Sequence, residues 1–367
     1  MEKFVIEPVF PHFLSEIAGF LFKCRTPEMA TSSARRTLMP DTPGIERRIR
    51  WLLLDNPAAK HSESLGFCAR DESGTVRGLT LCFPASFLRA GERIAGLGSG
   101  SFFVDSAMRS LGFFLFKRYL ACPGYAFYFA TTCNVASAPL WRQLGGAAVA
   151  RSEFELVLPL RLDSLAANRI ARIMPGRFFA EAARMGGRCA VPLLRLSVRS
   201  DRHLKVEPCQ DWNKLAALAW RHCLPDRVTS DRSAEMLYWR YGSDSPVQAG
   251  GIHLFRDSLG NEGWFALSGN TARTPGRAVG CTLLDVIWPS GKIDFRDILP
   301  QIIRSAPDSA EAVFIRCRPD FDFTKAWRWF VRQRLASPRA YVIAGKGAPS
   351  IRADLFDYED NDYVAWS

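Results

Sequence analysis

The feature that most constrains the fold is an order of strands and helices that occurs twice along the chain. Hydrophobic periodicity predicts one series within residues 1–160 and another within residues 201–367. A local similarity accompanies the two series, because Trp51 lies shortly before an Asn-Pro pair and Trp239 shortly before a Ser-Pro pair. A period of roughly 190 residues indicates a duplicated domain rather than short solenoid repeats. The 367 residues also exceed what one core usually organises.

The first series runs strand, helix, helix, three antiparallel strands, helix, strand, helix, strand. Helical spacing of apolar residues predicts the helices, and compact apolar runs bounded by turn residues predict the strands. The predicted strands are residues 4–6, 65–69, 76–83, 94–104, 125–131 and 151–160, and the predicted helices are residues 11–23, 45–53, 108–120 and 136–144.

The second series repeats this order after an Arg-rich connector. Its predicted strands are residues 204–206, 251–256, 263–268, 278–287, 312–317, 340–343 and 363–366, and its predicted helices are residues 212–223, 234–240, 295–304 and 325–335. We therefore expect an α/β fold of the mixed α+β kind. Two domains, residues 1–160 and 201–367, each hold a mostly antiparallel twisted sheet flanked by helices, and residues 161–200 form a helical connector.

Composition excludes several classes of protein. No apolar run approaches the roughly 20 residues that span a bilayer, and the start lacks a secretion signal, so we expect no membrane span and a cytoplasmic protein. Ten cysteines without a CxxC pair predict reduced core residues and no metal site. The net charge of +11 suits a nucleotide cofactor, an acidic glycan or nucleic acid, and equally a basic solvated surface. The arginines are spread and no DNA-binding motif is present, so we expect no DNA partner.

A strand-to-helix junction at residues 104–114 is the most informative local segment. It reads Val-Asp-Ser-Ala-Met-Arg-Ser-Leu-Gly-Phe-Phe and contains Arg109 and Gly112 in an Arg-x-x-Gly pattern. Unsatisfied N–H groups and the positive end of the dipole make a helix N-terminus an anion site where small residues allow close approach. The junction therefore predicts a phosphate site.

In this position the segment resembles the acyl-CoA pyrophosphate loop of the GNAT superfamily of N-acyltransferases. A second similarity is the segment from Asn134 to Gly145, which resembles the later helix that begins beside the pantetheine arm of the cofactor. The sequence departs from the family at Phe114, where a small residue is usual, and at Trp141, where a general-acid Tyr is usual. The resemblance implies an acyl-CoA site formed by Val104, Arg109, Ser110, Leu111, Gly112 and Asn134.

Acyl transfer to an amine needs a base and often an acid for the departing thiolate. The family's usual Glu is absent from the predicted strand at residues 94–104, which leaves Asp105, Glu153, Glu155, His222 or a water chain as the base. Asp105 is also suited to cap the following helix. The further catalytic candidates are Tyr128 and Cys133, on or just after the next strand, although both residue types are common in cores.

Two aromatic and basic clusters in the second domain could form substrate walls. They are Trp220, Arg221 and His222, and Trp239, Arg240 and Tyr241. Aromatic faces and guanidinium groups bind sugars and carboxylates, although each Trp could equally be packed in the core. The second domain's own junction at residues 285–292 lacks the Arg-x-x-Gly pattern, so we expect no cofactor there.

These observations predict an acyltransferase that moves an acetyl or other acyl group from acyl-CoA to the amine of a small molecule or sugar. Two alternatives remain open: a catalytically inactive scaffold with the GNAT fold, motivated by Phe114 and Trp141, and a transferase that uses aminoacyl-tRNA, with which the net charge of +11 is compatible. The acyl group, the acceptor and the oligomeric state are not encoded in any recognisable pattern.

Overall fold

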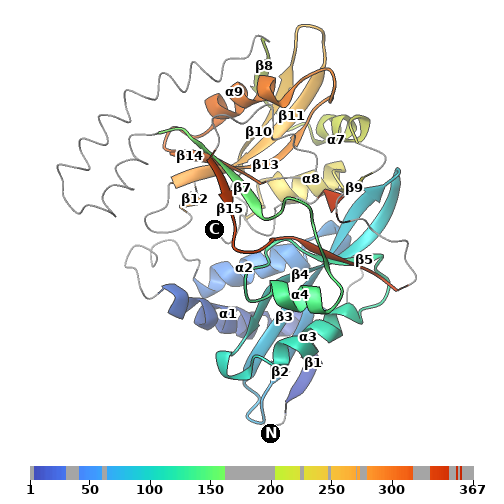
Figure 1. The fold of residues 1–367 in the computed structure, drawn as a ribbon, viewed down its shortest axis with the longest axis vertical. Helices are drawn as coiled ribbons and strands as arrows, with labels where there is room; N and C mark the ends of the chain where they lie inside the picture. The colour runs from blue at the N-terminus through green and yellow to red at the C-terminus, as the bar shows by residue number, and fades with distance from the viewer. Residues whose placement is uncertain are drawn as a thin grey trace, which may run out of the picture.

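The computed structural model describes residues 4–29, 41–59, 64–161, 203–223, 227–246, 249–269, 271–272, 279–316, 331–346, 353 and 356–357. These residues form two sheets with helices packed against them, one above the other in Figure 1. The α/β architecture with two mostly antiparallel sheets confirms the predicted fold class.

The first sheet has the strand order β1-β2-β3-β4-β5-β16-β6. Its strands are β1 (Val5–Pro8), β2 (Gly66–Arg70), β3 (Val76–Arg89), β4 (Glu92–Val104), β5 (Phe127–Ala130), β6 (Ala147–Ala148) and β16 (Tyr341–Ala344). Its helices are α1 (Leu14–Met29), α2 (Thr42–Leu53), α3 (Leu111–Leu120) and α4 (Ala138–Gln143), with short 3-10 turns at Pro11–Phe13, Pro57–Ala59 and Ser106–Met108. Of the strand pairs on this path, β4 and β5 run parallel.

The helices of the first domain cover opposite faces of this sheet. Successive side chains of a strand point to opposite faces. Phe127 and Phe129 of β5 pack in the core cluster that contains α1 and α2, whereas Tyr128 packs with α3 and α4. Helices α3 and α4 therefore lie on the face opposite to α1 and α2. We call the packed space between α3 and α4 the groove.

The second sheet has the order β15-β7-β14-β13-β11-β10-β8. Its strands are β7 (Phe154–Pro159), β8 (Lys205–Pro208), β10 (Ala249–Arg256), β11 (Glu262–Ser268), β12 (Thr271–Ala272), β13 (Val279–Ile287), β14 (Ala312–Arg316) and β15 (Val331–Arg334), and its helices are α7 (Trp212–Arg221), α8 (Ala234–Tyr241) and α9 (Phe295–Ser305). Several helices start where an Asp side chain caps the first turn: Asp41 accepts from Gly44 N–H, Asp211 from Lys214 N–H and Asp294 from Arg296 N–H.

The two sheets exchange strands. The sequence predicts residues 151–160 as the last strand of the first domain, but β7 pairs with β14 and β15 of the second sheet. In the same way β16, predicted as a strand of the second half, pairs with β5 and β6 of the first sheet. Figure 1 shows the green β7 among the orange and red strands of the upper sheet. Alternation of apolar residues predicts a strand but carries no information about its distant partner.

Two further segments of the second half join the first sheet. The strand β9 (Val228–Ser230) pairs with the end of β3, and β17 (Phe356–Asp357) pairs with β9. The long β3–β4 hairpin therefore reaches out of the first domain and contacts the second.

Reciprocal contacts relate the two domains. Trp51 Nε1 donates to the Trp239 carbonyl at 3.0 Å, and Trp239 Nε1 donates to the Trp51 carbonyl at 3.1 Å. The two rings stack with centroids 4.5 Å apart. Each tryptophan donates to the backbone carbonyl of the other, and such a symmetric contact is typical of two units related by a twofold axis. The similarity between Trp51 and Trp239 seen in the sequence thus corresponds to equivalent positions in the two domains.

One predicted helix is wrong in part, and two predicted segments lie outside the described residues. The helix predicted at residues 325–335 is wrong over residues 331–334, which form β15, because pairing with β7 outweighs the helical spacing of their apolar neighbours. The connector at residues 162–200 and the strand at residues 363–366 lie outside the described residues. Within the described residues no helix is long and apolar enough to cross a membrane.

Candidate functional site

The junction at which the sequence predicts a phosphate site lies between the end of β4 and the start of α3. A 3-10 turn at Ser106–Met108 follows β4, and α3 begins at Leu111. The N–H groups of Gly112 and Phe113 bond back to the Arg109 and Ser110 carbonyls, both at 3.2 Å. Two of the N–H groups that could hold an anion are therefore already used within the turn.

Packing accounts for the glycine of the Arg-x-x-Gly pattern. A Cβ on Gly112 would lie 3.2 Å from the Phe102 ring and 3.6 Å from a methyl group of Val104. The missing side chain therefore lets α3 approach β4, and it does not open a space toward solvent. Phe114, which departs from the family pattern, is 53% exposed and points away from the core.

Aromatic side chains fill the groove between α3 and α4. Phe116 of α3 meets Trp141 of α4 with ring centroids 4.7 Å apart, and Trp141 stacks on Tyr341 of β16 at 6.2 Å. These three rings are at most 2% exposed. The space between these two helices is therefore filled by side chains of the protein.

Tyr119 of α3 occupies the end of the pairing between β4 and β5. Its hydroxyl accepts a hydrogen bond from Phe129 N–H at 3.0 Å and donates toward the Leu97 carbonyl at 2.6 Å. The side chain is fully buried, and burial raises the pKa of its phenol well above the usual range. The backbone groups that a ligand could pair with at this point are thus engaged by the protein itself.

Of the three predicted catalytic residues, Tyr128 and Cys133 share a cluster and Asp105 lies apart from it. Asp105 accepts from Ala107 N–H at 3.1 Å and lies 3.3 Å from Arg77, which favours the cap interpretation. Tyr128 and Cys133 pack in the aromatic cluster between α3 and α4, where the Tyr128 hydroxyl donates to the Cys122 carbonyl. Burial raises the pKa of Tyr128 and raises that of Cys133 to about 12, so neither ionises near neutral pH.

Asn134 has a local structural role. Its side-chain oxygen accepts from the N–H groups of Ala136 at 2.9 Å and Ser137 at 3.0 Å. This bonding orders the turn before α4, as Asn commonly does at helix starts.

The structure places the two predicted substrate clusters in different surroundings. Trp239 forms the interdomain stack with Trp51, Arg240 is buried with Nη1 donating to the Asp231 carbonyl, and Tyr241 is buried in the large core cluster. Trp220, Arg221 and His222 instead line a cavity of about 940 Å³. The second cluster thus belongs to the domain interface and the first to a cavity.

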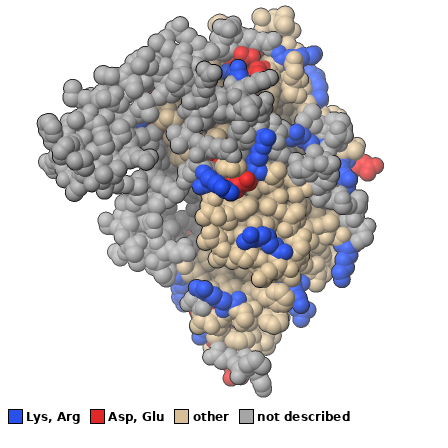
Figure 2. All heavy atoms as spheres, viewed as in Figure 1, with Lys and Arg blue, Asp and Glu red and all other residues tan. Residues whose placement is uncertain are grey.

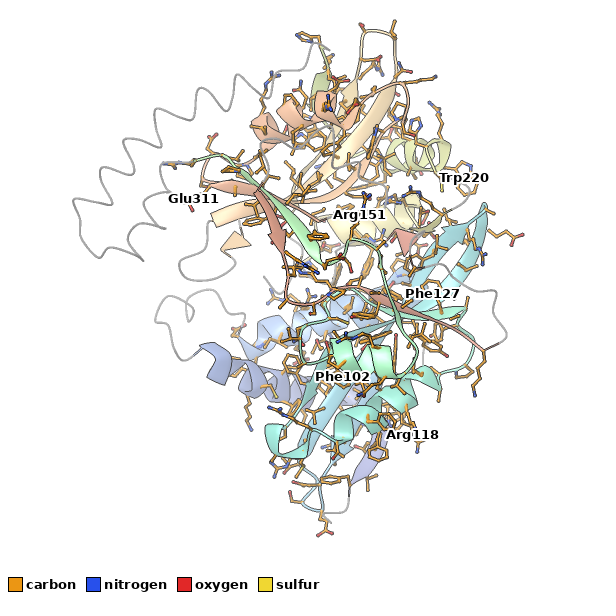
Figure 3. All side chains as sticks on the ribbon, in the orientation of Figure 1. Phe102, Arg118, Phe127, Arg151, Trp220 and Glu311 are labelled. Atoms are coloured by element: carbon orange, nitrogen blue, oxygen red, sulfur yellow. The ribbon has the colours of Figure 1, made fainter. Side chains whose placement is uncertain are left out.

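This interdomain cavity is formed by elements of both domains. The tip of the β3–β4 hairpin contributes Leu88, Gly91 and Arg93, and the remaining walls are α7, the segment at residues 227–234 and the end of β13 with the turn after it. Figure 3 shows Trp220 beside the hairpin tip, in the upper domain and far from Phe102 in the lower one. Trp220 is 59% exposed, so its ring is open to a ligand.

Arginines dominate the charge of the cavity. Arg93, Arg221, Arg227 and Arg232 line it, and among the described lining residues Asp231 is the one carboxylate. Arg232 is 6% exposed and binds Asp285 of β13 through two hydrogen bonds, at 2.7 and 3.1 Å. Because Asp285 is fully buried, this fork fixes the guanidinium in the cavity wall. The site therefore favours anions.

His222 is a titratable residue in the wall of the cavity, and a hydrogen bond defines which of its ring nitrogens carries the proton. Its Nε2 lies 3.1 Å from the Glu262 carbonyl oxygen, which can only accept, so Nε2 carries the proton and Nδ1 is an acceptor. Burial lowers the pKa of His222, the bond to Glu262 opposes this, and Arg221 and Lys292 lower it further. The imidazole is therefore neutral near pH 7.

The predicted cofactor loop and the cavity lie at opposite ends of β4. Arg93 is near the first residue of this 13-residue strand, and the junction with α3 follows its last residue. Such a strand extends roughly 40 Å. A ligand held in the cavity and one held at Arg109 would not meet.

Sequence reasoning found Trp220, Arg221 and His222 but missed Arg232, Asp231 and Asp285. One signal was present, because Asp285 is a carboxylate inside the apolar run of residues 283–287. A charge at such a position is rarely buried without a partner. The position of that partner, on the segment before α8, follows only from the fold.

Comparisons with known proteins identify solved structures that have a similar fold. The sequence matches no protein-family model and no curated protein sequence. Among solved structures, a conserved protein of unknown function from Enterococcus faecalis V583, described as a probable N-acyltransferase, is similar with a TM-score of 0.56, 11% identity and coverage of 94% of this chain and 73% of its own. N-myristoyltransferase of Saccharomyces cerevisiae, solved with myristoyl-CoA and inhibitors, is similar with a TM-score of 0.53, 11% identity and coverage of 93% and 79%.

A GCN5-related N-acetyltransferase from Kribbella flavida is similar with a TM-score of 0.50, 10% identity and coverage of 94% and 71%. These similarities extend over nearly the whole chain and show that it has the GNAT fold in a two-domain arrangement. The resemblance drawn from residues 104–145 is confirmed at the level of the fold. A shared fold does not define the reaction, which depends on the residues of the site.

Proposed function

We propose that the protein is an N-acyltransferase that moves an acyl group from an acyl-CoA to an amine, and that both reactants bind at the domain interface. The observation that carries the proposal is the basic interdomain cavity of about 940 Å³ with Trp220 and His222 in its walls. Acyl transfer as the class of reaction is supported by the similar solved structures, which include an N-acetyltransferase and an N-myristoyltransferase.

The cavity offers groups that suit each part of an acyl-CoA. Arg221, Arg227 and Arg232 would hold phosphate oxygens, for which the guanidinium fork is well shaped. Trp220 would stack on a flat ring such as adenine. Acyl-CoA supplies an acyl group that is already activated as a thioester.

When the amine nitrogen forms its bond to the acyl carbon, the C–S bond of the thioester breaks and CoA leaves as a thiolate. His222 would accept the proton that the nitrogen loses and would then give it to the thiolate sulfur. The lowered pKa keeps the imidazole in the form that can take up a proton, and the bond to Glu262 leaves Nδ1 as the accepting atom. Arg232, held by Asp285, would position the donor and takes no part in proton transfer.

Calorimetry with acetyl-CoA tests the proposal. Trp220→Ala is expected to weaken binding about tenfold, since stacking on an aromatic side chain contributes roughly 1–3 kcal/mol. Arg109→Glu is the matched control, and we expect it to bind like the wild type because Arg109 lies at the other end of β4. If Arg109→Glu abolishes binding while Trp220→Ala does not, the donor site belongs to the first domain and the proposal is wrong.

The alternatives give different results in the same experiment. Among the described residues on the face seen in Figure 2, Lys and Arg side chains lie apart over uncharged surface. Salt-sensitive binding of aminoacyl-tRNA without binding of acyl-CoA would nevertheless support the tRNA-dependent reaction. Binding of neither would support the scaffold, which the filled groove between α3 and α4 also favours.

A further inference from the structure

Two thiols meet in the aromatic cluster between α3 and α4, away from the interdomain cavity. Cys82 lies in β3, on the face of the sheet that these helices cover, and Cys122 lies in the turn between α3 and β5. The two side chains pack in the same cluster and hydrogen-bond to each other. Both cysteines are free. The proposed acyl transfer uses neither of them.

The two thiols differ in their access to solvent. Cys82 is 4% exposed, whereas Cys122 is half-buried in a turn whose neighbouring residues, Ala121 and Pro123, are exposed. The Sγ atom of Cys122 donates to the Arg118 carbonyl at 3.7 Å, which holds the side chain at the end of α3. A small reagent in solution therefore reaches the Cys122 sulfur first, and the Cys82 sulfur lies behind it.

The surroundings of the pair favour a thiolate at Cys122. The hydrogen bond from the Cys82 thiol lowers the pKa of Cys122, and burial opposes this. Burial raises the pKa of Cys82 well above its usual range, so Cys82 is the proton donor of the pair. The nearby phenols of Tyr119, Tyr125 and Tyr128 stay neutral, because burial raises the pKa of each. Thiolate character and exposure decide which cysteine of a protein is oxidised first.

We propose that Cys82 and Cys122 form a site of reversible oxidation by hydroperoxides. The Cys122 thiolate attacks the terminal oxygen of the hydroperoxide, the O–O bond breaks, and Cys122 becomes a sulfenic acid while the leaving oxygen takes up the proton that Cys122 lost. The Cys82 sulfur then forms a bond to the Cys122 sulfur, and the sulfenic hydroxyl leaves as water with the Cys82 proton. Two thiols are oxidised to a disulfide, and the hydroperoxide is reduced to water and an alcohol, or to two waters. The disulfide links the end of α3 to β3.

Mass spectrometry of the full chain after treatment with hydrogen peroxide tests the proposal. We expect a mass loss of about 2 Da, which corresponds to the two hydrogens that a disulfide lacks. Proteolysis of the treated protein should release one cross-linked species that contains Cys82 and Cys122. Dithiothreitol should restore the original mass and both free thiols.

Two serine variants separate the roles of the sulfurs. Cys122→Ser should abolish the cross-link and leave Cys82 reduced, because the remaining thiol is buried. Cys82→Ser should leave Cys122 as a sulfenic acid, which dimedone traps, because the second sulfur is missing. Circular dichroism checks that both variants fold. Cys209→Ser is the matched control, since Cys209 is also half-buried but lies in the second domain after β8, and it should cross-link like the wild type.

Three results would overturn the inference. They are an unchanged mass after peroxide treatment, oxidation of Cys122 without a bond to Cys82, and a cross-link between other cysteines in place of this pair. Each result is read from the wild-type protein, so the inference stays testable even where a variant fails to fold. The inference is independent of the proposed function, because neither cysteine lines the interdomain cavity.

Discussion

The groove between α3 and α4 and the interdomain cavity are two places where the sequence suggests a ligand, and they differ in what fills them. In the groove, Phe116, Trp141 and Tyr341 pack on one another and are almost fully buried. In the cavity, Trp220 is open and arginines line the walls. The comparison shows that packing alone can explain a match to a cofactor motif. The glycine of the Arg-x-x-Gly pattern, Gly112, is needed for the contact of α3 with Phe102.

The strongest test of the comparison pairs one tryptophan from each place. Trp141→Ala should lower the free energy of unfolding by about 3–5 kcal/mol, because it removes a buried aromatic ring and leaves a cavity. Trp220→Ala should change it by less than about 0.5 kcal/mol, because the ring is 59% exposed. Urea denaturation of both variants provides the measurement. Equal losses would mean that the two places are not packed differently.

The second test breaks the buried pair that holds the cavity wall. Arg232→Ala should cost about 3–5 kcal/mol of stability, because Asp285 is left as an uncompensated buried charge. The double variant Arg232→Met with Asp285→Leu should recover most of this stability and still fail to bind acetyl-CoA. Arg93→Ala should cost less than Arg232→Ala, because the buried Asp231 keeps its hydrogen bonds from the Ser86 hydroxyl and Ser233 N–H. A double variant that binds acetyl-CoA normally would exclude Arg232 from the site.

A smaller effect is expected from Tyr119→Phe in the groove. The change removes the hydroxyl that bonds to Phe129 N–H and the Leu97 carbonyl, and we expect a loss of about 1–3 kcal/mol. Thermal and urea unfolding measure it, with Tyr238→Phe as a control whose ring is 46% exposed. A neutral result would show that the hydroxyl does not tie β4 to β5.

The smallest effect concerns the protonation of His222. Its pKa should lie below 6.5, because burial disfavours the charged imidazole. The unfolded chain takes up this proton near pH 6.5 and the folded chain only at lower pH, so stability should fall as the pH decreases through that interval. NMR titration, with the resonance assigned through His222→Gln, gives the value. A pKa above 6.5 would contradict the neutral base.

Sequence patterns predicted the elements of both domains more reliably than the sites. The strands β2, β3, β4, β10 and β11 and the helices α2, α7 and α8 lie where hydrophobic periodicity predicts them. The error at residues 331–334 has a tertiary cause, since pairing with β7 decides their conformation. Of the candidate site residues, Trp220, Arg221 and His222 share a cavity, because an aromatic and basic cluster at a helix C-terminus is a local feature.

The sequence by itself predicted the duplication, most of the order of strands and helices in each half, and the similarity of the positions of Trp51 and Trp239, because these follow from local periodicity and from spacing. Tertiary structure alone decided that β7 and β16 change sheets, that the groove beside Arg109 is filled, and that Arg232 meets Asp285. The physical reason is that strand partners, packing space and buried ion pairs depend on residues far apart in the chain, which only the folded molecule brings into contact.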